Sequence, residues 1–65
     1  MNLIEEIQSE LKRVKEILPL YEAIPTGAFG AMMIKSDIKA GEESIASGDT
    51  VKMVSALANL QSIKS

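Results

Sequence analysis

Six residues near the middle of the chain carry the groups needed to bind a nucleotide: Tyr21, Thr26, Gly27, Ala28, Lys35 and Lys39. A tyrosine ring can stack on a nucleobase, a contact worth about 1–3 kcal/mol per base. Backbone N–H groups at the start of a helix can hold a phosphate where side chains leave them uncovered. A lysine adds a charge-assisted contact to the phosphate, particularly from a neighbouring subunit. The chemistry expected of these residues is binding.

The same residues also have a structural interpretation, which stays open at this stage. Gly27 can relieve the turn after Pro25 and Thr26, and Gly30 can let a helix or a neighbouring subunit approach closely. Tyr21 can be a residue at the edge of the core, with its hydroxyl in water.

Catalysis and metal binding have little support in the sequence. The chain has no His and no Cys, which removes the usual catalytic bases, the zinc ligand sets and disulfides. The neighbouring Glu42 and Glu43 would lie about 100° apart around a helix, so they do not form a shared carboxylate site. We expect no enzymatic activity, no metal and no cofactor.

The charge pattern argues against binding to DNA or to a membrane. The formal net charge is −2, and in a helix-turn-helix spanning residues 31–63 only Lys52 would offer a base-reading side chain near the start of the second helix. No hydrophobic run approaches the roughly 20 residues that span a bilayer. Glu5 and Glu6 stand where a signal peptide has basic residues. We therefore expect a cytoplasmic protein.

Hydrophobic periodicity predicts a first helix over residues 2–23. Asn2 is its expected N-cap, and Pro19 is expected to kink it. A competing interpretation ends this helix at Ile17 and begins a separate turn at Pro19. The apolar face recurs every three or four residues, at Leu3, Ile4, Ile7, Leu11, Val14, Ile17, Leu18 and Tyr21.

Two further helices are predicted over residues 27–46 and 50–63. Thr26 is the expected N-cap of the second helix, and Gly41 within it suggests close packing. Gly48 is expected to end that helix in the left-handed conformation, and Asp49 is expected to cap the third. The apolar stripes are Phe29, Met33, Ile34, Ile38, Gly41 and Ile45 in the second helix and Val51, Met53, Val54, Leu57, Leu60 and Ile63 in the third.

Chain length makes self-association the expected route to stability. A single core in 65 residues rarely supplies more than about 3–5 kcal/mol, and small proteins compensate with disulfides, metals or oligomerisation. The first two are excluded above. The predicted fold is therefore all-α, a three-helix chain built on a helical hairpin and completed by homo-oligomerisation.

The run from Ile24 to Ile63 resembles a group of short phage and prophage proteins, which carry an Ile-Pro-x-Gly-x-Phe-Gly segment, a following helix and an Ala-x-Gly-Asp turn. In size and architecture the chain is also similar to phage anti-defence sponges. These helical hairpins oligomerise and sequester cyclic-nucleotide signals made by CBASS or Thoeris systems. In such sponges a Tyr and a Lys from different subunits hold base and phosphate, which implies these roles for Tyr21 and Lys35.

The leading functional hypothesis from the sequence is therefore a phage-encoded, non-enzymatic sponge. It would bind a cyclic di- or trinucleotide at a subunit interface around the turn at Ile24–Gly30. The alternative is a homo-oligomeric protein-interaction module, an inhibitor or adaptor of a host or phage protein, that works through its apolar helix faces.

Overall fold

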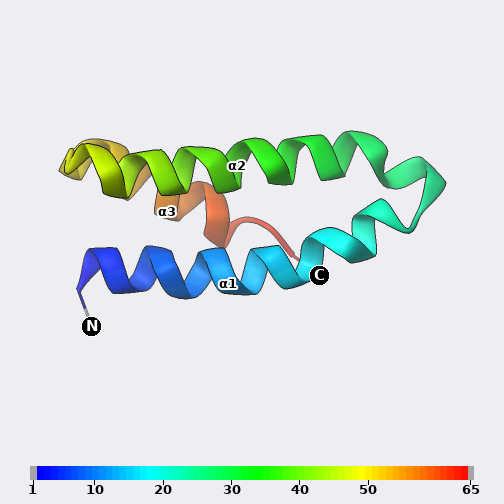
Figure 1. Cartoon of the computed structure of the whole chain (residues 1–65), viewed down its shortest axis with the longest axis horizontal. Helices are drawn as coiled ribbons and strands as arrows, with labels where there is room; N and C mark the ends of the chain where they lie inside the picture. The colour runs from blue at the N-terminus through cyan, green and yellow to red at the C-terminus, as the bar shows by residue number, and fades with distance from the viewer. Residues whose placement is uncertain (1, 65) are drawn as a thin grey trace.

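The computed structural model describes residues 2–64. Its elements are three helices and a short 3-10 turn: α1 (Leu3–Glu22), η1 (Pro25–Gly27), α2 (Ala28–Ser47) and α3 (Thr50–Gln61). The helices α1 and α2 form an antiparallel hairpin, and α3 packs against both from behind in the view of Figure 1. The described part of the chain contains no strand, so the all-α class is confirmed. None of these helices is both long and apolar enough to cross a membrane.

Local capping signals set three of the helix ends, as the sequence predicts. The side chain of Asn2 accepts a hydrogen bond from the N–H of Glu5 at 2.8 Å at the start of α1. Gly48 ends α2 with φ of +70°, in the left-handed region that favours glycine. Asp49 then caps α3, and its Oδ1 accepts from the N–H of Val51 at 2.9 Å. These three caps are confirmed.

Helix α1 continues through Pro19 to Glu22, so the interpretation that ends it at Ile17 is wrong. Proline removes one donor from the helix, but its own carbonyl still accepts from the N–H of Ala23 at 3.0 Å. Pro19 is exposed, so its ring faces away from the neighbouring helices. Figure 1 shows the last turns of α1, in cyan, rising toward α2.

The predicted N-cap at Thr26 is wrong. Gly27 holds the N-cap position of α2, and no side chain caps this helix. The physical reason is the 3-10 turn η1, in which Pro25 supplies the fixed φ of a first turn. Thr26 is taken up inside this turn before α2 begins, so its hydroxyl does not stand at the helix boundary.

The core takes most of its large side chains from α1. Helix α2 approaches with small buried residues, Ala31, Gly41 and Ser44. The buried large apolar side chains are Ile7, Leu11, Val14 and Ile17 of α1, Ile34 of α2, and Met53 and Leu60 of α3.

Gly41 lies where α2 meets both other helices. A Cβ at this position would stand 3.1 Å from Cδ2 of Leu11 and 3.2 Å from Cδ1 of Leu60. The Oγ of Ser44, which is also buried, donates to the Gly41 carbonyl at 2.7 Å. Glycine inside a helix costs roughly 1 kcal/mol relative to alanine, and the close packing expected at Gly41 accounts for its presence.

Arg13 of α1 holds the C-terminal end of α3. Its Nη2 donates to the carbonyl of Leu60 and its Nη1 to that of Ile63, both at 2.9 Å. Its Nε donates to Glu10 at 2.7 Å. Carbonyls in the last turn of a helix lack partners within the helix, so Arg13 is a C-terminal cap supplied by a different helix.

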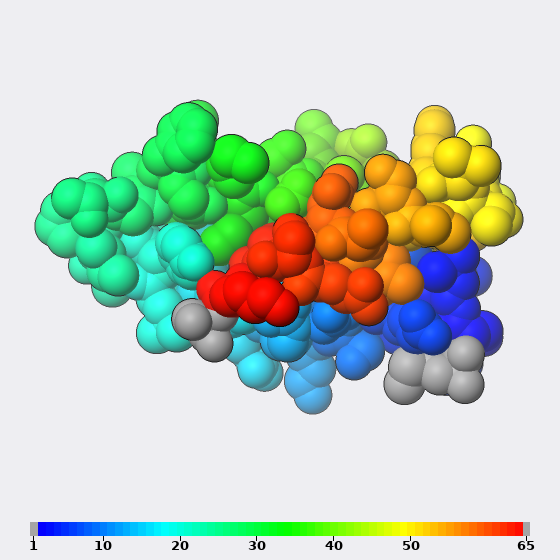
Figure 2. All heavy atoms as spheres, turned by 180° about the vertical axis from the view of Figure 1, so that it is seen from behind, coloured from blue at the N-terminus to red at the C-terminus, as the bar shows by residue number. Residues whose placement is uncertain are grey.

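Helix α3 is too short to cover the whole hairpin. It has 12 residues, whereas α1 and α2 have 20 each. At 1.5 Å per residue, this difference leaves about 12 Å of the hairpin beyond its reach. Figure 2 shows the uncovered end in cyan and green, beyond the red C-terminal segment.

Replacing Gly41 by Leu should lower the free energy of unfolding by about 1–3 kcal/mol, because the added side chain overfills the contact with Leu11 and Leu60. Ala46→Leu on the exposed face of α2 is the matched control and should change it by less than about 0.5 kcal/mol. Urea denaturation at one protein concentration, followed by circular dichroism, measures both. Equal stability of the two variants would contradict close packing at Gly41.

Candidate functional site

Tyr21 connects three parts of the molecule at the end of the hairpin. Its ring lies against Gly30 of α2, where a Cβ would stand 2.9 Å from the ring carbon Cδ2. Its hydroxyl donates to the carbonyl of Lys64 at 2.9 Å. Tyr21 is thus a half-buried residue packed at the edge of the core. The hydroxyl, which the structural interpretation placed in water, is bonded to the backbone.

The turn η1 contains the backbone groups expected to hold a phosphate. The N–H of Gly27 already donates to the carbonyl of Ile24 at 2.8 Å. A Cβ on Gly27 would overlap the carbonyl oxygen of Tyr21, so close approach to α1 requires a glycine here. Thr26 and Ala28, on either side of Gly27, are exposed. These contacts favour the structural interpretation of Gly27.

Lys35 and Lys39 each have an acidic partner. The Nζ of Lys35 lies 3.1 Å from Oε2 of Glu22 on α1. The Nζ of Lys39 lies 3.9 Å from Oε1 of Glu43, one turn along α2. Exposed ion pairs of this kind contribute at most about 1 kcal/mol. A bound phosphate could therefore displace either carboxylate.

Within one chain, Tyr21 and Lys35 line different hollows. Tyr21 faces a hollow of about 410 Å³ together with Phe29, Gly30, Met33 and Ile63. A second hollow of about 360 Å³ is lined by residues of the turn and of α2, among them Glu22, Pro25, Ala28, Met32 and Lys35. Of the six residues singled out in the sequence, Ala28 and Lys35 are brought together and Tyr21 stands apart from them. Lys39 lines neither hollow.

The most prominent feature at the turn end of the hairpin is a cluster of exposed apolar side chains, which the sequence did not predict. Phe29 and Met33 were expected on the buried stripe of α2, yet Phe29 is 74% exposed and Met33 is 53% exposed. Phe29 lies on the outward side of α2, in line with the exposed Ser36 and Ala40, and not on the side that meets α1 and α3. We call the large exposed apolar side chains of this region the hairpin-end surface, which consists of Leu20, Ile24, Phe29, Met32 and Met33.

One sequence signal points to this surface. The twelve residues from 23 to 34 include no Asp, Glu, Lys or Arg, although a quarter of the whole chain is charged. An uncharged stretch that holds Phe29 and both Met32 and Met33 is unusual for the end of a hairpin, because exposed turns are commonly polar. Periodicity alone assigned these side chains to the interior.

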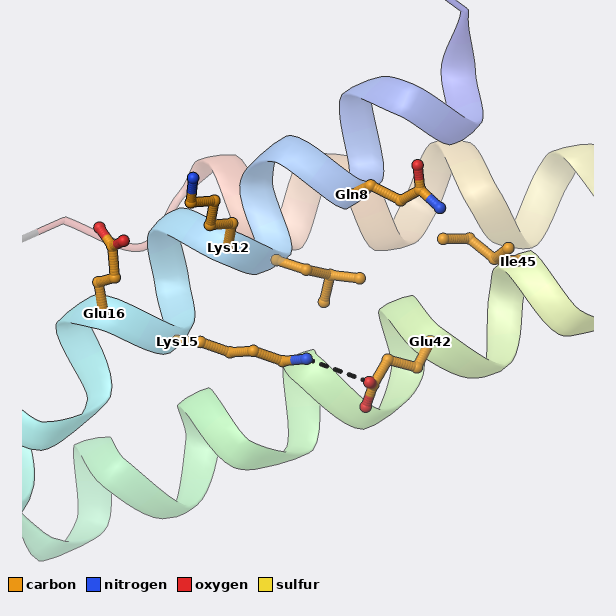
Figure 3. Close-up of a pocket in the computed structure, with 7 residues that line it drawn as sticks. Gln8, Lys12, Lys15, Glu16, Glu42 and Ile45 are labelled. Carbon is orange, nitrogen blue, oxygen red and sulfur yellow. Dashed lines mark hydrogen bonds and ion pairs between the residues drawn. The ribbon is translucent and has the colours of Figure 1, made fainter.

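A third hollow, of about 620 Å³, lies between α1 and α2. Its apolar lining comes from Leu11 and Ile45, and Lys15 reaches across it to Glu42 with an Nζ to Oε2 distance of 3.3 Å (Figure 3). Figure 3 also shows Lys12 pointing away from α2. Charges of both signs stand around this groove, so it presents no focused field to a charged ligand.

The described residues contain no group of three or more acidic or histidine side chains placed to hold a metal ion. Comparison of the chain with models of protein families, with curated proteins and with solved structures found no match.

Gly27→Ala should destabilise the protein by about 1–3 kcal/mol, because the added Cβ meets the backbone of Tyr21, which cannot move aside as a side chain can. Thr26→Ala is the neighbouring control and should change the free energy of unfolding by less than about 0.5 kcal/mol, since its hydroxyl caps no helix. Thermal and urea unfolding of both variants measures the difference. A Thr26→Ala loss as large as that of Gly27→Ala would restore a capping role for Thr26.

Proposed function

We propose that this chain is a non-enzymatic protein-interaction module that assembles with copies of itself through the hairpin-end surface. The observation that carries this proposal is the exposure of that surface. Each of its five side chains is more than half exposed, and a cluster of this kind on a small protein is typical of an interaction site. Burial against a second copy removes this apolar area from water, which is the main favourable term in association.

The composition of the surface supports a second copy as the occupant. Residues 23–34 are uncharged, so the hairpin end can pack against a second copy without burying a charge of its own, despite the negative net charge of the chain. The same lack of charge gives little to attract a strongly charged partner. Met32 and Met33 are flexible and polarisable, so they can adapt to the facing surface.

The double variant Phe29→Gln/Met33→Gln should be monomeric, with a mass of 7.0 kDa, under conditions in which the original chain sediments as a larger species. The double change removes two large apolar side chains from the interface and leaves the core untouched, so the helical content should be unchanged. Ile4→Gln, at a partly exposed apolar position in the first turn of α1, is the control and should leave association unaltered. Sedimentation equilibrium at micromolar concentration measures all three, and a monomeric original chain would refute the proposal.

A sponge for a cyclic di- or trinucleotide is the second candidate function. The observation in its favour is that Ala28 and Lys35 line the same hollow beside the turn, where a backbone N–H and an ammonium group can both approach a phosphate. Tyr21 would have to come from another subunit, because within one chain it lines a different hollow.

The sponge predicts opposite effects for two variants of one ion pair. Lys35→Ala should weaken binding of a cyclic nucleotide, and this loss should shrink at high salt. Glu22→Gln should strengthen binding, because it removes the carboxylate that lies 3.1 Å from the Lys35 ammonium and competes with the phosphate. Native mass spectrometry with a panel of cyclic di- and trinucleotides measures both. An assembled protein that binds none of the panel would rule out the sponge and leave the interaction module standing.

A further inference from the structure

The outward face of α2 changes from large to small side chains along its length. Phe29, Met33, Ser36, Ala40 and Ser47 follow one line along the helix, because their spacings of 4, 7, 11 and 18 residues are close to whole turns. All five are exposed. The first two are large and apolar, and the last three are small. The line itself carries no charge.

The small end of this line is hollowed. A space of about 580 Å³ lies between α2 and α3. Small side chains and Val51 form its floor, and Glu43, Lys52 and Asn59 complete the lining, which consists of Ala40, Glu43, Ser44 and Ser47 of α2 and Val51, Lys52, Ser55, Ala56 and Asn59 of α3.

The two ends of the face are therefore complementary in shape. Phe29 projects at one end, and the hollow lies at the other. They are about 27 Å apart along the helix axis, since five turns separate Phe29 from Ser47. Among the described residues, Val51 at 78% and Phe29 at 74% are the most exposed large apolar side chains. A single chain cannot bring them together, whereas a second copy running in the opposite direction can.

We infer that two copies pair through antiparallel α2 helices, with each Phe29 inserted into the hollow between α2 and α3 of the other copy. The twofold axis passes near residue 38, where Ser36 of each helix faces Ala40 of the other. Small side chains at this crossing let the helices approach closely. This inference rests on the proposed self-association and specifies its geometry.

A twofold contact needs both complementary features on one surface of one subunit, and the face of α2 has both. A parallel pair would instead set Phe29 against Phe29 and leave both hollows open.

The area available is that of a weak pair. Four large apolar side chains at the two ends of this face are each more than half exposed: Phe29, Met32, Met33 and Val51. With roughly 150–200 Å² for each fully exposed side chain, they offer on the order of 400–500 Å² per copy. Two copies then bury on the order of 800–1,000 Å², in the range of weak and transient protein pairs.

Disulfide trapping locates this contact directly, because the chain has no cysteine of its own. Met32→Cys and Glu43→Cys are both at exposed positions on one flank of α2. Antiparallel pairing places position 32 of one copy opposite position 43 of the other. Two copies of the same variant would hold their thiols about 15 Å or more apart along the axis, beyond the roughly 7 Å between Cα atoms that a disulfide spans.

When the two variants are mixed and mildly oxidised, we expect the mixed disulfide to be the dominant cross-linked species by mass spectrometry. Cross-linking of each variant mainly to itself would overturn the antiparallel geometry. Sedimentation of the original chain is measured alongside. An assembled protein without the mixed disulfide refutes the pairing alone, and a protein that is monomeric at every concentration refutes the proposed self-association as well.

A second pair of variants tests the hollow itself. Ser55→Phe fills it from α3, and we expect at least a tenfold weaker association with unchanged helical content. Ser9→Phe adds the same bulk to an exposed position on α1 and should leave association as it is. If the Ser55→Phe variant associates as strongly as the Ser9→Phe variant, no side chain of the partner enters the hollow.

Discussion

The difference in length between α3 and the hairpin is the constraint on which the rest of this structure depends. A 12-residue helix cannot cover two helices of 20 residues. The segment after α3 lies against the hairpin for a few more residues, because Arg13 donates hydrogen bonds to the carbonyls of Leu60 and Ile63. The hydroxyl of Tyr21 donates another to the carbonyl of Lys64. Beyond these contacts the hairpin has no neighbour. The apolar side chains of Phe29 and Met33 at this end are exposed, although their spacing along the sequence is typical of a buried stripe.

Signals that act within one turn of the chain could be predicted from the sequence. Asn2, Gly48 and Asp49 set helix boundaries through bonds to residues two to four positions away, and the apolar face of α1 follows from spacing alone. The prediction of Thr26 as the N-cap of α2 was wrong because a 3-10 turn precedes this helix and places Gly27 at its first boundary. The prediction that Phe29 and Met33 are buried was wrong for a different reason, since spacing alone does not show which side of α2 meets the other two helices. The bonds of Arg13 to the far end of α3 join residues about 50 positions apart, which no local pattern reports.

One aromatic residue accounts for both glycines of the turn. The backbone carbonyl of Tyr21 excludes a Cβ at Gly27, and its ring crowds a Cβ at Gly30. The spacing that suggested a phosphate-binding helix start is thus explained by packing against α1. The backbone of the turn is therefore occupied in packing, whereas the large apolar side chains beside it are exposed.

The fold and the proposed assembly use different residues of α2, so the free energy of folding and that of association depend on different side chains. The face toward α1 and α3 is built from Ala31, Ile34 and Gly41, and its packing determines whether the monomer folds. Phe29 and Met33 add little to that packing, since more than half of each remains in water. Association through Phe29 and Met33, as proposed, would stabilise the folded chain only to the extent that a second copy is bound. The free energy of unfolding should therefore rise with protein concentration. A chain with a core this small gains most from such coupling. In the proposed assembly, the exposed face of α2 is the part of the core that a second copy completes.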